Sequence, residues 1–259
     1  KPLPRVDAHY RVTGTARYAF DRKLPGMLHA GFVRSPYAHA RVVKVDTSAA
    51  EQIPGVVDII HAGNGVNMPF EATELFPEEV RYAGEEVAAI AAETPQALKE
   101  ALLAVKVEYQ QLPHVTDVRE AIALSPQKAQ SIFPKGVVVP TKHVGRGDVN
   151  AGFAAADAVV ELEIENQVVH HNTFEPHGGV AFWHDDTLEY WVSTQSKYLI
   201  QQGLAASFQL PQDKVKVYME FMGAGFGSKT GLMKPDLAAA LFSKRTGRPV
   251  RLFLTRAEE

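Results

Sequence analysis

The stretch "MEFMGAGFGSKT" (residues 219–230) lies between an apolar run and a predicted helix in a chain of 259 residues. Gly223, Gly225 and Gly227 occupy alternate positions, and the large aromatic Phe226 lies between the last two. Glycine permits positive φ angles and close backbone approach, so the N–H groups of such a turn can point into one concavity. The stretch therefore predicts either a loop that binds an anion or an oxo group, or a turn without a ligand.

Two nucleotide-binding motifs fit this loop poorly. A P-loop requires glycine directly before its lysine, and Ser228 occupies that place here. Only 29 residues follow Thr230, and the strand expected among them reaches a threonine and an arginine before any carboxylate that could hold Mg²⁺. A dinucleotide fingerprint fails because its third glycine comes one place early, at Gly227. A P-loop nucleotide-binding protein is kept as the less favoured alternative.

Composition limits the class of protein. Hydrophobic residues make up 46% and charged residues 22% of the chain, which is typical of a globular protein with a sizeable core. A net charge of -3, without a run of Lys or Arg, argues against a nucleic-acid partner. The absence of cysteine excludes disulfides and iron–sulfur clusters ligated by this chain. We expect no membrane span and no signal peptide, and a cytoplasmic location with the periplasm as the alternative.

The first half of the chain predicts a mixture of strands and helices. Residues 28–48 contain two strand-like runs, and residues 51–63 contain a turn followed by a third. Residues 85–113 predict strand, helix and strand, with the helix beginning at Thr94, which can cap it, followed by a proline. The composition then shifts toward Pro, Gly and polar residues. We therefore predict a first domain at 1–120, a linker at 121–148 and a second domain at 149–259.

The second half also alternates between strand and helix patterns. Apolar and polar residues nearly alternate from 158 to 170, which favours a strand. The segment "KYLIQQGLAASFQL" (197–210) has helical periodicity. After the glycine loop, "KPDLAAALFSKRTG" predicts a helix stopped by Gly247, and "RPVRLFLTR" predicts a strand. The strands and helices together indicate an α+β fold.

Taken with its neighbours, the glycine loop resembles the molybdenum-binding large subunit of the xanthine oxidase/aldehyde oxidase family of molybdenum hydroxylases. The resemblance rests on "VKVYMEFMGAGFGSK" (215–229) followed by "KRTGRPVRLFLTRAEE" (244–259), and on "STQ" (193–195) and "HHNTFEPHGGVAFW" (170–183) upstream. The segment "PRVDAHYRVTGTARYAFDRKLPGMLHAGFV" (4–33) is similar to the opening of the family's α/β hammerhead domain. The ordered motifs span essentially the whole chain and match the N-terminal portion of such a subunit.

The resemblance implies a fold, a reaction and a cofactor. The fold is an α/β hammerhead domain followed by the first part of a molybdopterin-binding α+β domain. The reaction is hydroxylation of an aldehyde or N-heteroaromatic carbon, with water as the oxygen source. The cofactor is molybdenum–molybdopterin, in the cytosine dinucleotide form usual for bacterial relatives. Electrons pass to [2Fe–2S] clusters and FAD, which are expected on an iron–sulfur subunit and an FAD subunit.

Carried over position by position, the resemblance assigns the loop to the cofactor. Gly225, Phe226 and Gly227, with Gly223, are expected to bind the metal–pterin through main-chain N–H groups, and the ring of Phe226 is expected to close the pocket. No side chain of this chain is expected to ligate the metal. The family's general base is a Glu of a Gly-x-Gly-Glu segment that this sequence lacks. We therefore expect a second molybdopterin-binding chain to complete the site, in a split subunit, and keep a fragment as the alternative.

Three further positions are predicted to lie near the small-molecule substrate. Val169 stands where several members have a Gln near the metal, and Thr230 stands where purine-oxidising members have a carboxylate. His171 is expected to pack or hydrogen-bond beside the pocket, and Glu175 is expected to be tied structurally to backbone or to a His. These features favour an aldehyde substrate over a purine. A non-catalytic scaffold subunit that docks partners without metal is the second alternative.

Overall fold

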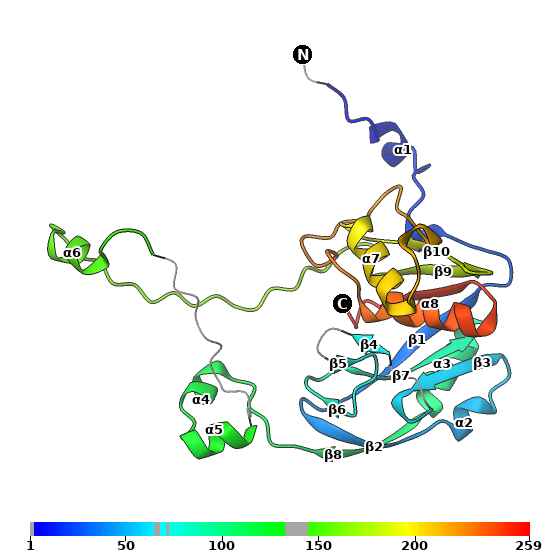
Figure 1. Ribbon diagram of the computed structural model, residues 1–259, viewed down its shortest axis with the longest axis horizontal. Helices are drawn as coiled ribbons and strands as arrows, with labels where there is room; N and C mark the ends of the chain where they lie inside the picture. The colour runs from blue at the N-terminus through cyan, green and yellow to red at the C-terminus, as the bar shows by residue number, and fades with distance from the viewer. Residues whose placement is uncertain (1–2, 65–67, 71–72, 133–144) are drawn as a thin grey trace. The chain divides into compact units, whose positions relative to one another are not determined.

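A seven-stranded mixed sheet runs through both halves of the sequence in the computed structural model, which describes residues 3–64, 68–70, 73–132 and 145–259 (Figure 1). Its strand order is β11-β10-β9-β12-β1-β7-β3, and a second sheet has the order β6-β2-β8. The strands are β1 (Leu28–Arg34), β2 (Ala40–Asp46), β3 (Val56–His61), β4 (Pro69–Phe70), β5 (Thr73–Glu74), β6 (Glu79–Val80), β7 (Glu86–Ala92), β8 (Lys106–Gln111), β9 (Gly178–His184), β10 (Thr187–Val192), β11 (Val215–Tyr218) and β12 (Val250–Phe253).

The chain divides into two units, residues 1–112 with 171–259 (the main unit) and residues 113–170 (the second unit). The main unit contains α1 (Ala8–Val12), η1 (Ala19–Asp21), α2 (Ser48–Glu51), η2 (Ala62–Asn64), α3 (Pro95–Ala104), α7 (Lys197–Phe208), η3 (Gln212–Lys214) and α8 (Lys234–Thr246). The second unit contains α4 (Val118–Ile122), α5 (Pro126–Ile132) and α6 (Val149–Ala154). Much of the predicted linker, residues 133–144, lies outside the described residues, and the predicted domain limits stay a prediction.

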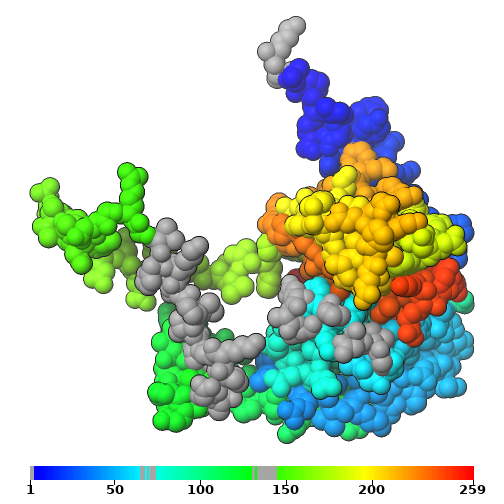
Figure 2. Space-filling model, viewed as in Figure 1, coloured from blue at the N-terminus to red at the C-terminus, as the bar shows by residue number. Residues whose placement is uncertain are grey.

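The main unit joins the two halves of the sequence through β12, which pairs in parallel with β1 and antiparallel with β9. In Figure 2 the described residues up to 112 (blue through cyan to green) and residues 171–259 (yellow-green to red) lie against each other in one body. The predicted hammerhead region therefore shares its principal sheet with the predicted molybdopterin-binding region, which local sequence patterns did not indicate.

Helices cover both faces of the sheet. On one face, α7 and α8 pack over a core that includes Leu28, Trp183 and Leu237. On the other face, Ile90 packs against Ala101 and the rest of α3. Strand β7 lies between β1 and β3 with every residue buried, which explains its nearly continuous apolar sequence.

Capping residues set the start of α3 and the end of α8 where the sequence predicted them. The Thr94 hydroxyl accepts the Ala97 N–H at 3.1 Å, with proline at the first helical position, as expected for the start of α3. Such a cap contributes about 1 kcal/mol. Helix α8 ends at Thr246, and the capping residue Gly247 that follows has a left-handed φ of 66°. In contrast, the predicted strand at 158–170 is not formed: these residues are extended coil with exposed side chains.

A buried hydrogen bond fastens α8 to β10. The Tyr190 hydroxyl donates to the Asp236 carboxylate at 2.6 Å, and the Met233 N–H donates to its other oxygen at 2.7 Å. Burial raises the pKa of Asp236 to about 6, and both hydrogen bonds oppose that rise without cancelling it. The charged form of Asp236 is therefore costly inside the fold.

Asp236→Asn should remove a pH dependence of stability. The folded-state pKa lies above the unfolded value of 3.8, so the contribution of Asp236 is fully present below 3.8 and is lost as the pH rises through about 6. We expect the free energy of unfolding of the wild type, relative to the variant, to fall by about 2 kcal/mol between about pH 4 and about pH 7. Denaturant unfolding of both proteins across that range measures it, and a constant difference would contradict the assignment.

Candidate functional site

Four segments converge at one end of the large sheet. Strand β10 runs parallel to β11 and antiparallel to β9, which is itself antiparallel to β12. The carboxyl ends of β10, β11 and β12 therefore meet the amino end of β9. The residues that follow or precede these strands there are 193–195, 219–230, 254–259 and 171–177. The sheet topology thus gathers the motifs that carry the resemblance.

Glu175 holds the beginning of the glycine loop. Its side chain is buried, and one carboxylate oxygen accepts the Gly223 N–H at 2.7 Å and the Ser193 hydroxyl at 2.8 Å. The other oxygen accepts the Phe20 N–H at 3.1 Å. A Cβ atom on Gly223 would lie 2.5 Å from the Cβ of Glu175, so this glycine is required by packing within the chain. The structural role predicted for Glu175 is confirmed.

Lys229 holds the end of the loop from inside. Its side chain is buried, and the ammonium donates to the main-chain oxygen of Glu175 at 2.5 Å and to the Ser193 hydroxyl at 2.8 Å. Burial lowers the pKa of Lys229, against the opposing effect of the Glu175 charge. A P-loop lysine reaches outward to the phosphates. The inward direction of this one argues against the nucleotide-binding alternative.

Gln195 supports the loop from beneath, a role that sequence reasoning did not assign. Its side-chain oxygen accepts the Gly227 N–H at 2.8 Å and the Lys229 N–H at 3.4 Å. A Cβ atom on Gly225 would lie 2.5 Å from that oxygen. The available signal was the position of Gln195 directly after β10, at the same sheet end as the loop.

The middle of the loop has three successive N–H groups for which the described residues provide no acceptor, and Gly225, which carries the second of them, is buried. Within the described part of the chain, no group accepts the N–H of Ala224, Gly225 or Phe226. Ala224, Phe226 and Gly227 have φ angles of 77°, 50° and 97°, whereas that of Gly225 is not positive. Successive residues with φ angles of opposite sign are typical of the concave main-chain nests that bind anions. These three amides could therefore hold an anionic or electron-rich group.

The exposed side of the loop consists of Phe226 and Gly227. The Phe226 side chain is 71% exposed although it is large and apolar. Space is open around the Cβ position of Gly227, whose positive φ is the feature that favours glycine there. A ligand held by the free amides would find an aromatic wall beside it.

The predicted pocket residues are less well supported. Val169 is exposed and belongs to the second unit, and Thr230 is exposed directly after Lys229. The His171 side chain is exposed and no hydrogen bond to it occurs in the described residues, so its place beside the pocket stays a prediction. His177 is the buried histidine of this segment, and its Nδ1 lies 3.0 Å from the Glu259 carboxylate.

No cluster of three His, Asp or Glu side chains suited to a metal ion occurs among residues 3–64, 68–70, 73–132 and 145–259. In the same described part of the chain, no helix is long and apolar enough to cross a bilayer.

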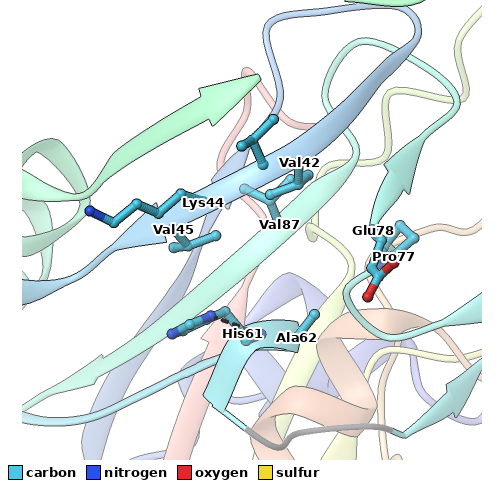
Figure 3. Close-up of a pocket in the computed structure, with 10 residues that line it drawn as sticks. Val42, Lys44, Val45, His61, Ala62, Pro77, Glu78 and Val87 are labelled. Carbon is cyan, nitrogen blue, oxygen red and sulfur yellow. Dashed lines mark hydrogen bonds between the residues drawn. The ribbon is translucent and has the colours of Figure 1, made fainter. Parts of the chain in front are cut away.

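A separate cavity of about 350 Å³ lies beside the three-stranded sheet (Figure 3). Figure 3 shows the His61 ring on one wall and the side chains of Val42, Val45 and Val87 across from it. Burial lowers the pKa of His61, and the Gly63 N–H donates to its Nδ1 at 3.1 Å. None of the predicted site residues is among those that line this cavity.

Comparison with known families agrees with the geometry. Residues 13–113 match the aldehyde oxidase and xanthine dehydrogenase a/b hammerhead domain, and residues 131–259 match the molybdopterin cofactor-binding domain. Together the two matches cover most of the chain, in the order predicted from the motifs.

Individual relatives extend well beyond this chain. It is 36% identical to a probable xanthine dehydrogenase subunit of Bacillus subtilis, over 98% of this chain and 34% of that protein. It is 33% identical to the nicotinate dehydrogenase large molybdopterin subunit of Eubacterium barkeri, over 98% of this chain and 60% of that protein. The chain therefore spans between about a third and about three fifths of the length of these relatives.

A solved structure of this family has the same fold over nearly the whole of this chain. The reconstituted CO dehydrogenase from Oligotropha carboxidovorans superposes with a TM-score of 0.84 at 30% identity, over 99% of this chain and 35% of that one. The chain belongs to the family of molybdenum hydroxylase large subunits and comprises their hammerhead domain and the start of their molybdopterin-binding domain.

Proposed function

We propose that this chain supplies one wall of the active site of a molybdenum hydroxylase, and that its glycine loop holds the molybdenum–molybdopterin cofactor. The observation that carries the proposal is the run of three unpaired N–H groups at Ala224, Gly225 and Phe226, within a domain match for molybdopterin binding. The cofactor supplies two-electron oxidation of a carbon centre with water as the oxygen source.

The residues of the loop fit that group in a specific way. The N–H groups of Gly223 and Gly227 are already donated to Glu175 and Gln195, so they position the loop. The donors toward the cofactor are then the amides between them. The exposed Phe226 ring shields the bound group from water, and the open space at Gly227 leaves room for it.

The proton acceptor of the reaction is proposed to come from outside these 259 residues. Both carboxylate oxygens of Glu175 are occupied by donors. The Arg34 guanidinium donates to Glu258 at 2.7 Å, and His177 engages Glu259. A general base needs a free carboxylate within hydrogen-bond reach of its proton. A Glu on a second molybdopterin-binding polypeptide, in a split subunit, meets that need.

Electron transfer is proposed to continue on partner subunits. The chain has no cysteine, so [2Fe–2S] clusters belong to an iron–sulfur subunit, with FAD on a further subunit. We propose the cytosine dinucleotide form of the cofactor from the resemblance to bacterial members of the family.

The substrate is proposed to be an N-heteroaromatic compound or an aldehyde. Relatives at 30% identity or more include proteins named for nicotinate, nicotine and xanthine and a CO dehydrogenase, whereas two solved aldehyde oxidoreductases are 24% and 19% identical. Thr230 replaces the carboxylate expected of purine-oxidising members, which disfavours a purine. This comparison moves the N-heteroaromatic class ahead of the aldehydes favoured by the sequence motifs.

The cofactor assignment predicts molybdenum and pterin in amounts equimolar with this chain. The measurement is elemental analysis and pterin fluorescence of the intact assembly, purified through a tag on this chain from a molybdate-supplied host. An intact assembly without molybdenum would contradict the proposal and support the scaffold alternative.

Gly225→Ala should deplete the cofactor without unfolding the chain. The new methyl group would lie 2.5 Å from the Gln195 oxygen, so it would push that side chain away from the Gly227 N–H. We expect a loss of about 1–3 kcal/mol in stability and about a tenfold loss of bound molybdenum.

Gly231→Ala is the matched control, because its Cβ position has open space and its φ is not positive. It should keep the wild-type molybdenum content. Equal molybdenum in both variants, with both folded by thermal unfolding, would overturn the role of the loop.

A further inference from the structure

The cavity beside the three-stranded sheet, shown in Figure 3, has the size of a small-molecule site. Its volume of about 350 Å³ falls within the range of about 300–1,000 Å³ that is usual for ligand pockets. It lies between β2 and the end of β3, and β7 contributes Val87 to its wall. All of its lining residues belong to the main unit, so a single unit of the chain forms it.

A β-bulge gives the cavity an aliphatic wall. Residues 42–45 of β2 all line the cavity, although successive residues of a regular strand face opposite sides of the sheet. The register of β2 against β8 shifts between Val42 and Lys44, which breaks this alternation. Val42 and Val45 therefore lie on the same wall, with Val87 beside them (Figure 3). Such a wall favours an apolar ligand, because contact removes both apolar surfaces from water.

His61 places one hydrogen-bond donor opposite this wall. Its side chain is only 9% exposed. The Gly63 N–H donates to Nδ1 at 3.1 Å, so Nδ1 carries no proton and the proton of the imidazole is on Nε2. No group among the described residues accepts a hydrogen bond from Nε2, and this atom is not sealed from solvent. A buried donor is therefore open to the cavity without a partner.

The turn after β3 holds this donor in place. The Asn64 side-chain oxygen accepts the His61 N–H at 3.1 Å, and the Asn64 amide donates to the main-chain oxygen of Ile59 at 2.7 Å. The main chain of His61 and its ring nitrogen Nδ1 are thus both fixed by neighbours in the turn. A ligand that accepts from Nε2 would find the donor already oriented, which lowers the cost of binding.

The charged residues of the cavity face water. Among its described lining residues, those with charged side chains are Lys44 and Glu78, and both are exposed. Burial lowers the pKa of His61, which favours the neutral imidazole. A charged ligand would therefore lose water of hydration without gaining a buried counter-ion, and this cost disfavours it.

We propose that this cavity binds a neutral, mainly apolar small molecule whose one hydrogen-bond acceptor, a carbonyl oxygen or a ring nitrogen, takes the proton donor of His61 Nε2. The valine wall selects for apolar surface, and the unpaired donor selects for the acceptor. No residue of the glycine loop lines the cavity, so the site is separate from the proposed cofactor site.

Binding of indanone to the intact assembly tests the proposal, measured by saturation-transfer difference NMR. Indanone is a neutral bicyclic ketone with a single acceptor, and it is neither an aldehyde nor an N-heteroaromatic compound. Indane has the same two rings without the carbonyl. We expect a Kd for indanone below about 1 mM, and binding of indane weaker by about tenfold. Absence of indanone binding, or equal binding of the two compounds, would overturn the proposal.

Three variants locate the bound ketone. His61→Phe keeps a ring and removes the donor, so it should weaken indanone by about tenfold and change indane by less than about twofold. Val45→Phe fills the cavity and should weaken both compounds by about tenfold or more. Val57→Phe is the matched control, because Val57 is exposed on β3 and does not line the cavity. Equal losses in Val45→Phe and Val57→Phe, with both folded by thermal unfolding, would contradict binding in this cavity.

The cofactor-depleted variant Gly225→Ala separates this site from the proposed active site. Its affinity for indanone should stay within about twofold of the wild type, because the cavity shares no residue with the glycine loop. Loss of indanone binding in Gly225→Ala, with binding kept in Val45→Phe, would assign the ketone to the glycine loop and overturn the cavity site.

Discussion

The buried ammonium of Lys229 is the interaction on which the candidate site depends. It donates to the main chain of Glu175 and to the Ser193 hydroxyl, while the carbonyl of Lys229 accepts the Gln195 N–H at 2.7 Å and the Thr194 hydroxyl at 3.1 Å. Leaving a buried charge without its partners costs about 3–5 kcal/mol. The segments before β9, after β10 and after β11 are therefore held to one another by a charge that cannot reach water.

This anchoring explains why the loop can hold an unfavourable backbone conformation. Positive φ at Ala224 and Phe226 costs of order 1 kcal/mol or more at each residue. Hydrogen bonds to Glu175 and Gln195 fix the loop at Gly223 and at Gly227. These two contacts restrict the backbone conformations open to the strained residues between them. Their N–H groups are thus arranged before any ligand arrives, and binding need not order them.

Features set by neighbours in sequence could be predicted, whereas those set by distant partners could not. The Thr94 cap, the stop at Gly247 and the glycine-rich turn are local signals, and each appears where it was expected. The pairing of β12 with β1 and the support from Gln195 join residues far apart in the chain. Local sequence patterns do not identify either pairing, because each depends on which sheet ends the fold brings together.

The three glycines of the loop also show what local sequence patterns cannot predict. The sequence suggested that they leave space for a cofactor. In the structure, a side chain at Gly223 would meet Glu175 and one at Gly225 would meet Gln195, and only Gly227 borders open space. The pattern was recognised correctly, but the physical reason for two of the three glycines is packing within the chain.

The backbone of 158–170 and the three unpaired amides of the loop both lack hydrogen-bond partners among the described residues, but for different reasons. The alternation of residues is a correct local signal, yet a strand exists only when another strand accepts its hydrogen bonds, so the segment stays coil where none is present. The three unpaired N–H groups of the loop are main-chain donors, and an electron-rich ligand is the partner that we propose for them.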